Sequence, residues 1–311
     1  MPSHHIDTIL GAGEEQSVIA LQKAGFELKQ IARMLRIPMG QVRYVLLEHN
    51  QRIGGDISQM LDKIDIGHTP VNLSGDNWMI TCDWHVPQTD WTLVERMVAV
   101  AKKHNIRRMV IAGDFFDQGQ FSRYASVIPP TPWAVERDAA HLIMDYLLGW
   151  FDEIDIVMGN HDRRLTRWAD AALDLKDIWG DIVTDRRVHI TQFGWCTITT
   201  SRTLDDGRPL VWRATHPKNY SQIRGKIGGD IADMYDMSVI SGHEHHTAIV
   251  KSRSGRHWAM SLGGLYDPAK IVYTQLDDGL STKMSPSFGM LLDGYPYVFA
   301  NGLTDWSKWG C

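Results

Sequence analysis

The stretch that decides the fold is Arg107–Gly119, which reads RRMVIAGDFFDQG. Its first half, Met109–Ala112, is a short apolar run with the composition of a buried strand. Gly113 breaks this run and places Asp114 and Asp117 on a tight turn just past the end of the strand. Open α/β sheets bind their ligands at the carboxyl ends of strands. The stretch therefore predicts an α/β fold with a functional site at this turn.

Three further strand-like runs end in side chains of metal-ligand type. Met79–Cys82 precedes Asp83 and His85, Ile154–Met158 precedes Asn160 and His161, and Met237–Ser241 precedes His243 and His245. Carboxylate, amide and imidazole groups from four strand ends can hold two metal ions, with one carboxylate between them. Taken singly, each residue could instead cap a helix or be an ordinary histidine. The set together favours a metal site.

Length and composition limit the class of protein. The 311 residues, 43% of them hydrophobic, suffice for a large core and about two domains. No apolar run reaches the roughly 18 residues of a membrane-spanning helix, so we expect a cytoplasmic protein with no membrane partner, in the host cytoplasm if a phage encodes it. The three cysteines are far apart and favour reduced thiols. A net charge of -5 argues against uniform binding to polyanions.

The amino-terminal segment has helical periodicity. Apolar residues at helical spacing predict three helices, at Glu14–Ala24, Leu28–Leu35 and Met39–His49. Their packing residues resemble the helix-turn-helix of resolvases and transposases, as found in phage and mobile-element proteins. In that family the third helix enters the major groove of DNA.

By this resemblance, Gln41, Arg43 and Tyr44 would face DNA. Six basic residues against two acidic ones between Lys23 and Arg52 give this segment a local charge of +4. The alternative is a small helical unit that docks on its own catalytic domain or on a protein partner.

Gly, Pro and Ser mark a linker after this segment. Gly54, Gly55, Pro70, Ser74 and Gly75 interrupt the pattern, around a candidate short helix at 57–64. We therefore expect a helix-turn-helix head at 1–55, a linker at 56–75 and a catalytic domain at 76–311.

Beyond the linker, strand-like and helical runs alternate. Helices predicted at Trp91–His104 and Ala134–Trp150 lie between site-bearing strands, which implies βαβ units with parallel pairing. After Val183 shorter runs predict a mixed, partly antiparallel half; these runs are Val188–Phe193, Thr197–Thr200, Pro209–Thr215, Ala248–Lys251 and His257–Leu262.

The motifs resemble those of the calcineurin-like metallophosphoesterases in their order along the chain and approximately in their spacing. They are Asp83-x-His85, Gly113-Asp114-x-x-Asp117, Gly159-Asn160-His161-Asp162, the isolated His216, and Gly242-His243-x-His245, within Trp78–Leu262. The resemblance implies a four-layer αββα sandwich with a dinuclear metal site at the carboxyl ends of the strands. The small all-α helix-turn-helix domain would precede it.

Carried over by residue, the resemblance implies two sets of metal ligands. Asp83, His85 and His245 would bind one ion, Asn160, His216 and His243 would bind the other, and Asp114 would bridge them. The shared carboxylate offsets the repulsion between two cations, while neutral ligands leave enough positive charge to bind phosphate. His189 lies in the same interval as His216, but it falls inside its own strand, so we prefer His216.

The resemblance also implies a mechanism. Water bridging the two ions loses a proton near neutral pH and attacks phosphorus in line. His161 is the family's general acid for the departing oxygen, and Asp117 matches the carboxylate that orients it. Asp162, Glu244 and His246 are expected to be structural or to support the ligands.

One departure from the family narrows the substrate. Members that act on phosphoserine and phosphothreonine follow the second Asp with Arg-Gly, whereas this chain has Gln118-Gly119, which argues against protein phosphatase activity. Arg163 and Arg164, with Arg123 in an aromatic loop, are candidate contacts to a polynucleotide. A solvated face on a helix that continues through Ala172 is the alternative for Arg163 and for Arg167 of the same basic cluster. A loop held down by its aromatic residues is the alternative for Arg123.

These inferences converge on a phosphodiesterase that hydrolyses DNA and is similar to DNA-repair exonucleases. The expected cofactors are two divalent ions, manganese first, with magnesium, iron or zinc as alternatives. The alternative function is a phosphomonoesterase or small-nucleotide phosphodiesterase with a protein-docking head. DNA is the expected partner, and Trp306 and Trp309 could either anchor the tail or form a homodimer.

Overall fold

The computed structural model of the chain forms two compact units, Met1–Lys63 and Ile64–Cys311. The structure describes residues 12–52, 66–67, 70–123, 129–170, 172–271 and 284–311. The short helix considered at 57–64 lies outside these residues. Among the helices described, none is long and apolar enough to cross a membrane.

The first unit contains three helices, as the sequence predicts. They are α1 (Ala12–Lys23), α2 (Leu28–Leu35) and α3 (Met39–Arg52). Glu27 and Gln30 form a capping box at the start of α2, and Arg36 ends that helix in the left-handed region at φ 55°. A small core holds the helices together; its buried members are Val18, Ile31, Val42, Val45 and Leu46.

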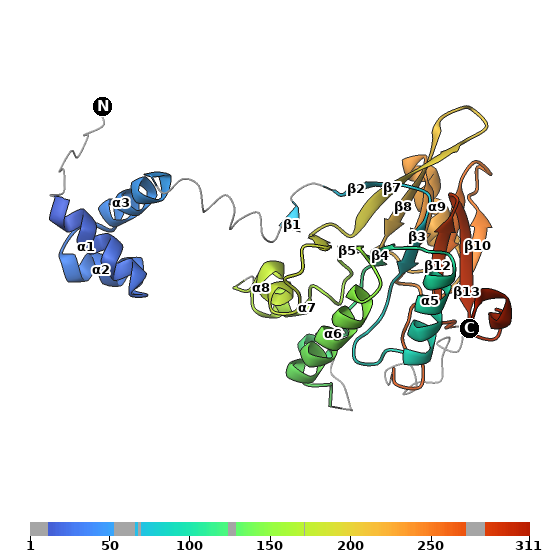
Figure 1. Ribbon diagram of the computed structural model, residues 1–311, viewed down its shortest axis with the longest axis horizontal. Coiled ribbons are helices and arrows are strands. Elements are labelled where there is room, and N and C mark those ends of the chain that lie inside the picture. Colours follow the sequence, from blue (N-terminus) through green and yellow to red (C-terminus); the bar gives the residue numbers. More distant parts are fainter. Residues whose placement is uncertain (1–11, 53–65, 68–69, 124–128, 171, 272–283) are drawn as a thin grey trace. The chain divides into compact units, whose positions relative to one another are not determined.

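The second unit is built on two sheets (Figure 1). The larger sheet, here sheet A, has seven strands in the order β1-β6-β5-β4-β3-β12-β13. Their bounds are Ile66–Gly67, Val188–Thr191, Glu153–Val157, Arg108–Ala112, Trp78–Thr81, Ser287–Leu292 and Tyr295–Ala300. The strands from β1 to β3 in this order are parallel, and β12 and β13 add an antiparallel edge.

The smaller sheet, sheet B, has six strands in the order β10-β11-β9-β8-β7-β2. Their bounds are Ala248–Lys251, Trp258–Ser261, Ser238–Ser241, Pro209–Thr215, Trp195–Thr203 and Asn72–Ser74. Parallel pairs (β9 with β8 and with β11) and antiparallel pairs (β7 with β8, β10 with β11) occur together. The mixed second half expected from the short runs is thus present.

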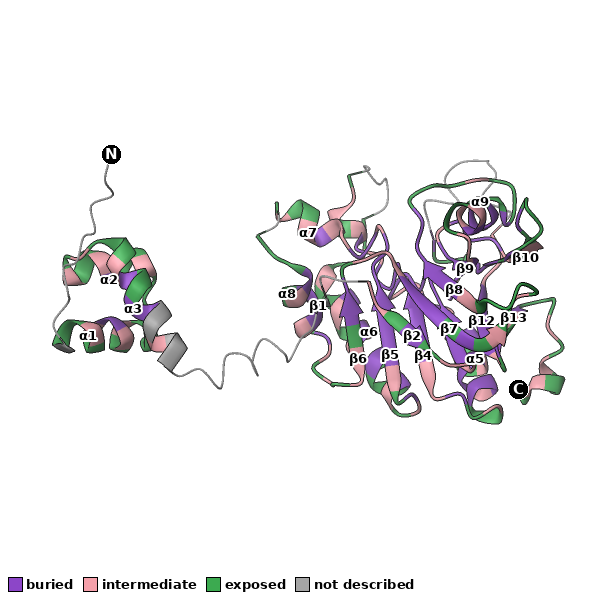
Figure 2. Cartoon of the chain, turned by 90° about the horizontal axis from the view of Figure 1, so that it is seen from above, coloured by how far each residue is buried: buried purple, intermediate pink, exposed green. Residues whose placement is uncertain are grey.

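The two sheets and their helices make a four-layer αββα sandwich. The helices α5 (Trp91–Lys103) and α6 (Trp133–Leu148) contribute apolar residues to a core shared with sheet A, and α9 (Lys226–Tyr235) packs on β9 and β11 of sheet B. A second core between the sheets includes Ile80 and Val110 from sheet A and Ile198 and Trp212 from sheet B. The strands at the centre of the sandwich are largely buried (Figure 2).

Four elements differ from the sequence prediction. Strands β1 and β2 lie within 56–75, the range expected to be linker, where short polar runs gave no strand pattern. Strand β12 was not predicted, although it pairs with both β3 and β13. The helix after the catalytic motif does not continue through Ala172, because α7 (Arg164–Trp168) ends before Asp170, whose φ is 49°.

The carboxyl-terminal tail is anchored on the catalytic unit. Trp306 packs near Phe299, with ring centroids 6.3 Å apart, and the Arg96 guanidinium lies 4.8 Å from the Trp306 centroid. Trp309 meets Phe299 edge-on at 4.7 Å. The tail therefore has the anchoring role considered from its sequence.

Candidate metal centre

Five strand ends converge on one site at the edge of the sandwich. In sheet A, β3 leads to Asp83 and His85, β4 to Asp114 and Asp117, and β5 to Asn160 and His161; in sheet B, β8 leads to His216 and β9 to His243 and His245. The parallel arrangement of β3, β4 and β5, and of β8 and β9, places these carboxyl ends together.

The first group of side chains contains Asp83, His85 and His245, whose ligand atoms lie within 4.8 Å of one another. His245 Nε2 is 3.1 Å from Asp83 Oδ1 and 3.2 Å from His85 Nε2. All three residues are buried. This is the set expected for one metal ion.

The second group contains Asp114, His216 and His243, again within 4.8 Å of one another. His216 Nε2 is 3.1 Å from Asp114 Oδ2 and 3.2 Å from Asn160 Oδ1. The structure therefore brings together the four residues expected at the second ion. The rival, His189, lies on β6 in a different cluster.

Asp117 and His161 join the two groups into one site. Asp117 Oδ1 lies 3.3 Å from Nδ1 of both His161 and His85. His161 Nδ1 is also 2.9 Å from the Asp117 carbonyl oxygen, and the His161 amide donates to Asp114 Oδ1 at 2.7 Å. Asp117 is thus placed to orient the imidazole of His161.

The backbone at these strand ends is strained. Asp83, His85, Asp114, His243 and His245 have φ values of 47°, 45°, 51°, 76° and 56°. Such left-handed conformations are uncommon outside glycine and concentrate at functional sites.

Two glycines of the motifs are required because aspartate side chains pack directly against their Cα atoms. A Cβ at Gly159 would lie 2.0 Å from Asp114 Oδ1, and one at Gly242 would lie 2.5 Å from Asp83 Oδ2. No other residue type fits without moving the carboxylates. These glycines set the positions of the ligands.

Two buried acids hold the loops that carry the site. Asp162 accepts hydrogen bonds from the amides of Asp114, Phe116 and Gly159 at 2.8 to 3.0 Å, which agrees with the structural role expected for it. Glu136 on α6 was not singled out from the sequence; it accepts from the Gln118 amide at 2.6 Å. Only a buried-acid pattern inside a helix could have pointed to it.

Burial and charge pairing shift the titration of the site. Burial acts to raise the pKa of the Asp114 carboxyl, but His216 and His161 outweigh burial and hold this pKa well below its usual range. Burial opposes and Asp114 favours the charged form of His216, whose pKa is raised to about 9. Burial, with His216 nearby, lowers the pKa of His243 to about 4.

Of the three arginines expected to bind substrate, Arg164 is the one that contacts residues of the candidate metal centre. Its Nη2 lies 2.8 Å from His161 Nε2, and its Nη1 donates to the Asp117 carbonyl at 2.9 Å. Arg163 instead donates to the Gln192 carbonyl at 2.6 Å, and Arg123 is exposed on the loop after η1 (Gly119–Phe121).

The α7 helix also exposes a tryptophan that the sequence did not single out. The Trp168 residue is 68% exposed, and its ring lies 5.3 Å from that of Phe121.

Gln118 is buried, and its Oε1 accepts a hydrogen bond from the Leu165 amide at 2.8 Å. The residue that replaces the phosphate-binding Arg of protein phosphatases is therefore used to hold α7.

In the first unit, α3 carries the residues expected to face DNA. Val42, Val45 and Leu46 are buried, whereas Arg43 and Tyr44 are exposed. Gln41 is half-buried. The expected exposure of Arg43 and Tyr44 is confirmed.

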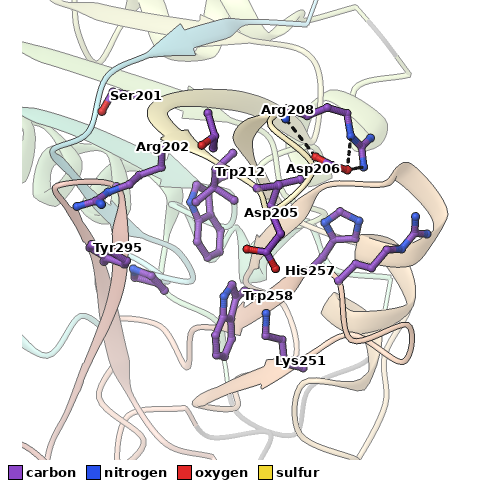
Figure 3. A pocket seen from close by; sticks show the side chains of 16 residues that line it. Ser201, Arg202, Asp205, Asp206, Arg208, Trp212, Lys251, His257, Trp258 and Tyr295 are labelled. Atoms are coloured by element: carbon purple, nitrogen blue, oxygen red, sulfur yellow. Dashed lines mark hydrogen bonds and ion pairs between the residues drawn. The ribbon is translucent and has the colours of Figure 1, made fainter.

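A cavity of about 640 Å³ lies away from this centre (Figure 3). It is lined by the β7–β8 hairpin, with Trp258 from β11 and Tyr295 from β13. It opens beside Leu210 and Trp212 in the first half of β8, whereas the metal ligand candidate His216 follows the end of that strand. None of the residues predicted for metal binding or catalysis lines this cavity.

The comparison with protein families agrees with the fold and the site. Residues 78–247 match the model of the calcineurin-like phosphoesterases, which is more than half of the chain. The chain therefore belongs to the calcineurin-like phosphoesterase family and is a metal-dependent phosphoesterase. A comparison with curated proteins finds no match.

The donor sets fit divalent ions. Each group offers imidazole nitrogens and a carboxylate, which suit zinc, iron or manganese, and Asp114 is 1% exposed at the centre of the site. Close packing of His85 Nε2 and His245 Nε2, at 3.2 Å, is easier to explain when a cation lies between them.

We expect Asp114→Ala to lose far more metal than a change at a ligand of one ion, because Asp114 is the carboxylate expected to be shared by both ions. His243→Ala should lose one ion, since Asp83, His85 and His245 remain. Metal analysis of the purified variants measures this. Two ions bound to Asp114→Ala would contradict the bridging role.

Proposed function

We propose that this protein is a dinuclear-metal phosphodiesterase that hydrolyses DNA, with His161 as general acid. The observation that carries the proposal is the placement of α7, which sets Arg164 against His161 and exposes Trp168. Arg164 is a cation next to the proposed general acid, and Trp168 is an exposed aromatic ring. Together they suit a substrate that has both phosphates and bases.

The residues that would hold the ions are the two groups at the strand ends. Asp83, His85 and His245 would bind one ion and Asn160, His216 and His243 the other, with Asp114 shared. Bound ions, for which we propose manganese, polarise the phosphoryl oxygens and lower the pKa of water at the site.

The proton path is set by His161 and its neighbours. Arg164 can only donate, so His161 Nε2 accepts from it while Nδ1 donates to the Asp117 carbonyl. A substrate phosphate that draws the guanidinium away releases Nε2, which can then take up a proton from water and give it to the departing oxygen. Asp117 keeps the ring oriented during this exchange.

The position of Gln118 supports a substrate other than a phosphoprotein. Its buried amide leaves no cation at the place where protein phosphatases clamp phosphate. Arg164 supplies a cation from α7 instead, four residues before Trp168. Four residues of helix span about 6 Å, so one face of α7 can contact a phosphate and a neighbouring base together.

We propose that the amino-terminal unit is a helix-turn-helix that directs the enzyme to DNA. Two observations support this: α2 and α3 are separated by only Arg36, Ile37 and Pro38, and α3 exposes Arg43 and Tyr44 beside its buried residues. The third helix of such a unit contacts the major groove.

We expect His161→Ala to keep its metals and lose turnover. The loss should reach about 100- to 10,000-fold on DNA, whose leaving group needs a proton, and be much smaller on nitrophenyl esters. Steady-state rates on both substrates measure the difference. Equal losses would count against His161 as the acid.

We expect the manganese-loaded protein to cleave single-stranded DNA faster than cyclic nucleotides or a phosphomonoester, because α7 offers a stacking ring. Trp168→Ala should raise the KM for DNA about 5- to 150-fold, the effect of losing one base stack. Parallel assays on all four kinds of substrate, including duplex DNA, test this.

Trp168→Phe is the matched variant and should restore most of the affinity, since it keeps an aromatic face. Bis-nitrophenyl phosphate has no base next to a second phosphate, so its KM should change far less than that of DNA in both variants. Preference for the phosphomonoester would favour a small-nucleotide or phosphomonoester enzyme with a protein-docking head.

We expect deletion of Met1–Ile53 to leave hydrolysis of bis-nitrophenyl phosphate unchanged and to weaken DNA binding. Each lost phosphate contact should reduce the slope of log affinity against log salt by about 0.9 on duplex DNA. Arg43→Ala should reproduce part of the loss without unfolding, because the side chain is exposed. An unchanged affinity and slope would show that the head docks on protein.

A further inference from the structure

Another cluster of possible metal ligands lies away from the candidate metal centre. Glu153 and Asp155 are two residues apart on β5, so their side chains share one face of sheet A, and His189 is the direct cross-strand neighbour of Asp155 on β6. The ligand atoms of these three residues lie within 4.8 Å of one another.

Asp155 is the unusual member of this cluster. It is 2% exposed, and within the described residues its carboxylate oxygens have no well-formed hydrogen bond. They have an ion pair, in which His189 Nδ1 lies 3.4 Å from Oδ1 and which raises the pKa of His189. A buried carboxylate without a well-formed hydrogen bond is costly, and an ion is one of its ordinary explanations. Burial and the Asp155 charge raise the pKa of Glu153, although Arg108 and His189 act in the opposite direction.

We propose that Glu153, Asp155 and His189 bind a third divalent cation, of the zinc class. His189 Nδ1 lies 3.4 Å from Asp155 Oδ1. This is longer than a good hydrogen bond, but two ligands at about 2.1 Å from a tetrahedral zinc ion are separated by about 3.4 Å. One imidazole and two carboxylates suit zinc better than magnesium or calcium, which prefer oxygen alone.

The cluster is open to solvent on the His189 side. The His189 side chain is 51% exposed, which provides access from solvent and a position for water as the fourth ligand. Arg108 lies opposite Glu153 on β4, but its Nη1 donates to the Ser74 carbonyl at 2.7 Å and its guanidinium lies 4.4 Å from the Trp78 centroid.

The third site is independent of the catalytic one. Glu153 begins β5, whereas Asn160 and His161 follow the end of the same strand. A cation here would link β5 to β6 and so stabilise one side of sheet A, without touching substrate.

The test counts zinc in the full chain. After chelation, wild-type protein is dialysed against buffered zinc and analysed for bound metal. His189→Ala and Asp155→Asn should each bind one equivalent fewer than wild type, hydrolyse bis-nitrophenyl phosphate at an unchanged rate, and lose the zinc-dependent rise in Tm that this site contributes. His141→Ala, on α6 and outside every cluster, should match wild type.

The same comparison is made in an Asp114→Ala background, which is expected to bind less metal at the catalytic centre. His189→Ala should again remove one equivalent there, so an error in the catalytic assignment would change the totals but not this difference. Equal zinc content with and without the His189 substitution in both backgrounds would overturn the proposal and leave a simple pair between His189 and Asp155.

Discussion

The structure depends on one buried carboxylate, that of Asp114. It lies 1% exposed at the end of β4, accepts a hydrogen bond from the His161 amide, and lies 3.1 Å from His216 across the gap between the sheets. Because Asp114 joins groups from β4, β5 and β8, the relative position of the two sheets is coupled to the site. The absence of any side chain at Gly159 is a direct consequence, since a Cβ there would meet Asp114 at 2.0 Å.

Holding the ligands in this arrangement costs stability. Five site residues adopt left-handed φ angles, at about 1 to 2 kcal/mol each, which is comparable with the whole net stability of a typical domain. Two features offset the cost within the described residues. Asp162 ties the turns after β4 and β5 together through three amides, and Glu136 fixes the turn that carries Asp117. The strained turns are thus held by hydrogen bonds to two acids that are not among the proposed metal ligands.

Much of the fold and site was predictable because the ligands follow apolar runs, three of which are interrupted by Gly113, Gly159 and Gly242. Val110 and Ile111 are buried strand residues before Gly113, so composition and punctuation agree there. Strands β1 and β2 were missed because pairing, not local composition, makes them strands. Glu136 and Trp168 were missed for a related reason. An acid or a tryptophan within a helical pattern does not show what it contacts, and here the contacts are the Gln118 amide and the Phe121 ring.

The replacement at position 118 shows how one side chain can reassign a neighbouring element. An exposed Arg there would act on phosphate directly, but the buried Gln118 instead accepts the Leu165 amide and so fixes the first turn of α7. Fixing that turn places Arg164 against His161 Nε2 and presents Trp168 on the surface. On the proposed function, α7 thus supplies the cation that the loop after β4 lacks, together with an aromatic ring. With that proposed function, a change from a clamp for one phosphate to a track for phosphate and base requires no change in the proposed metal ligands, because none of them lies on α7.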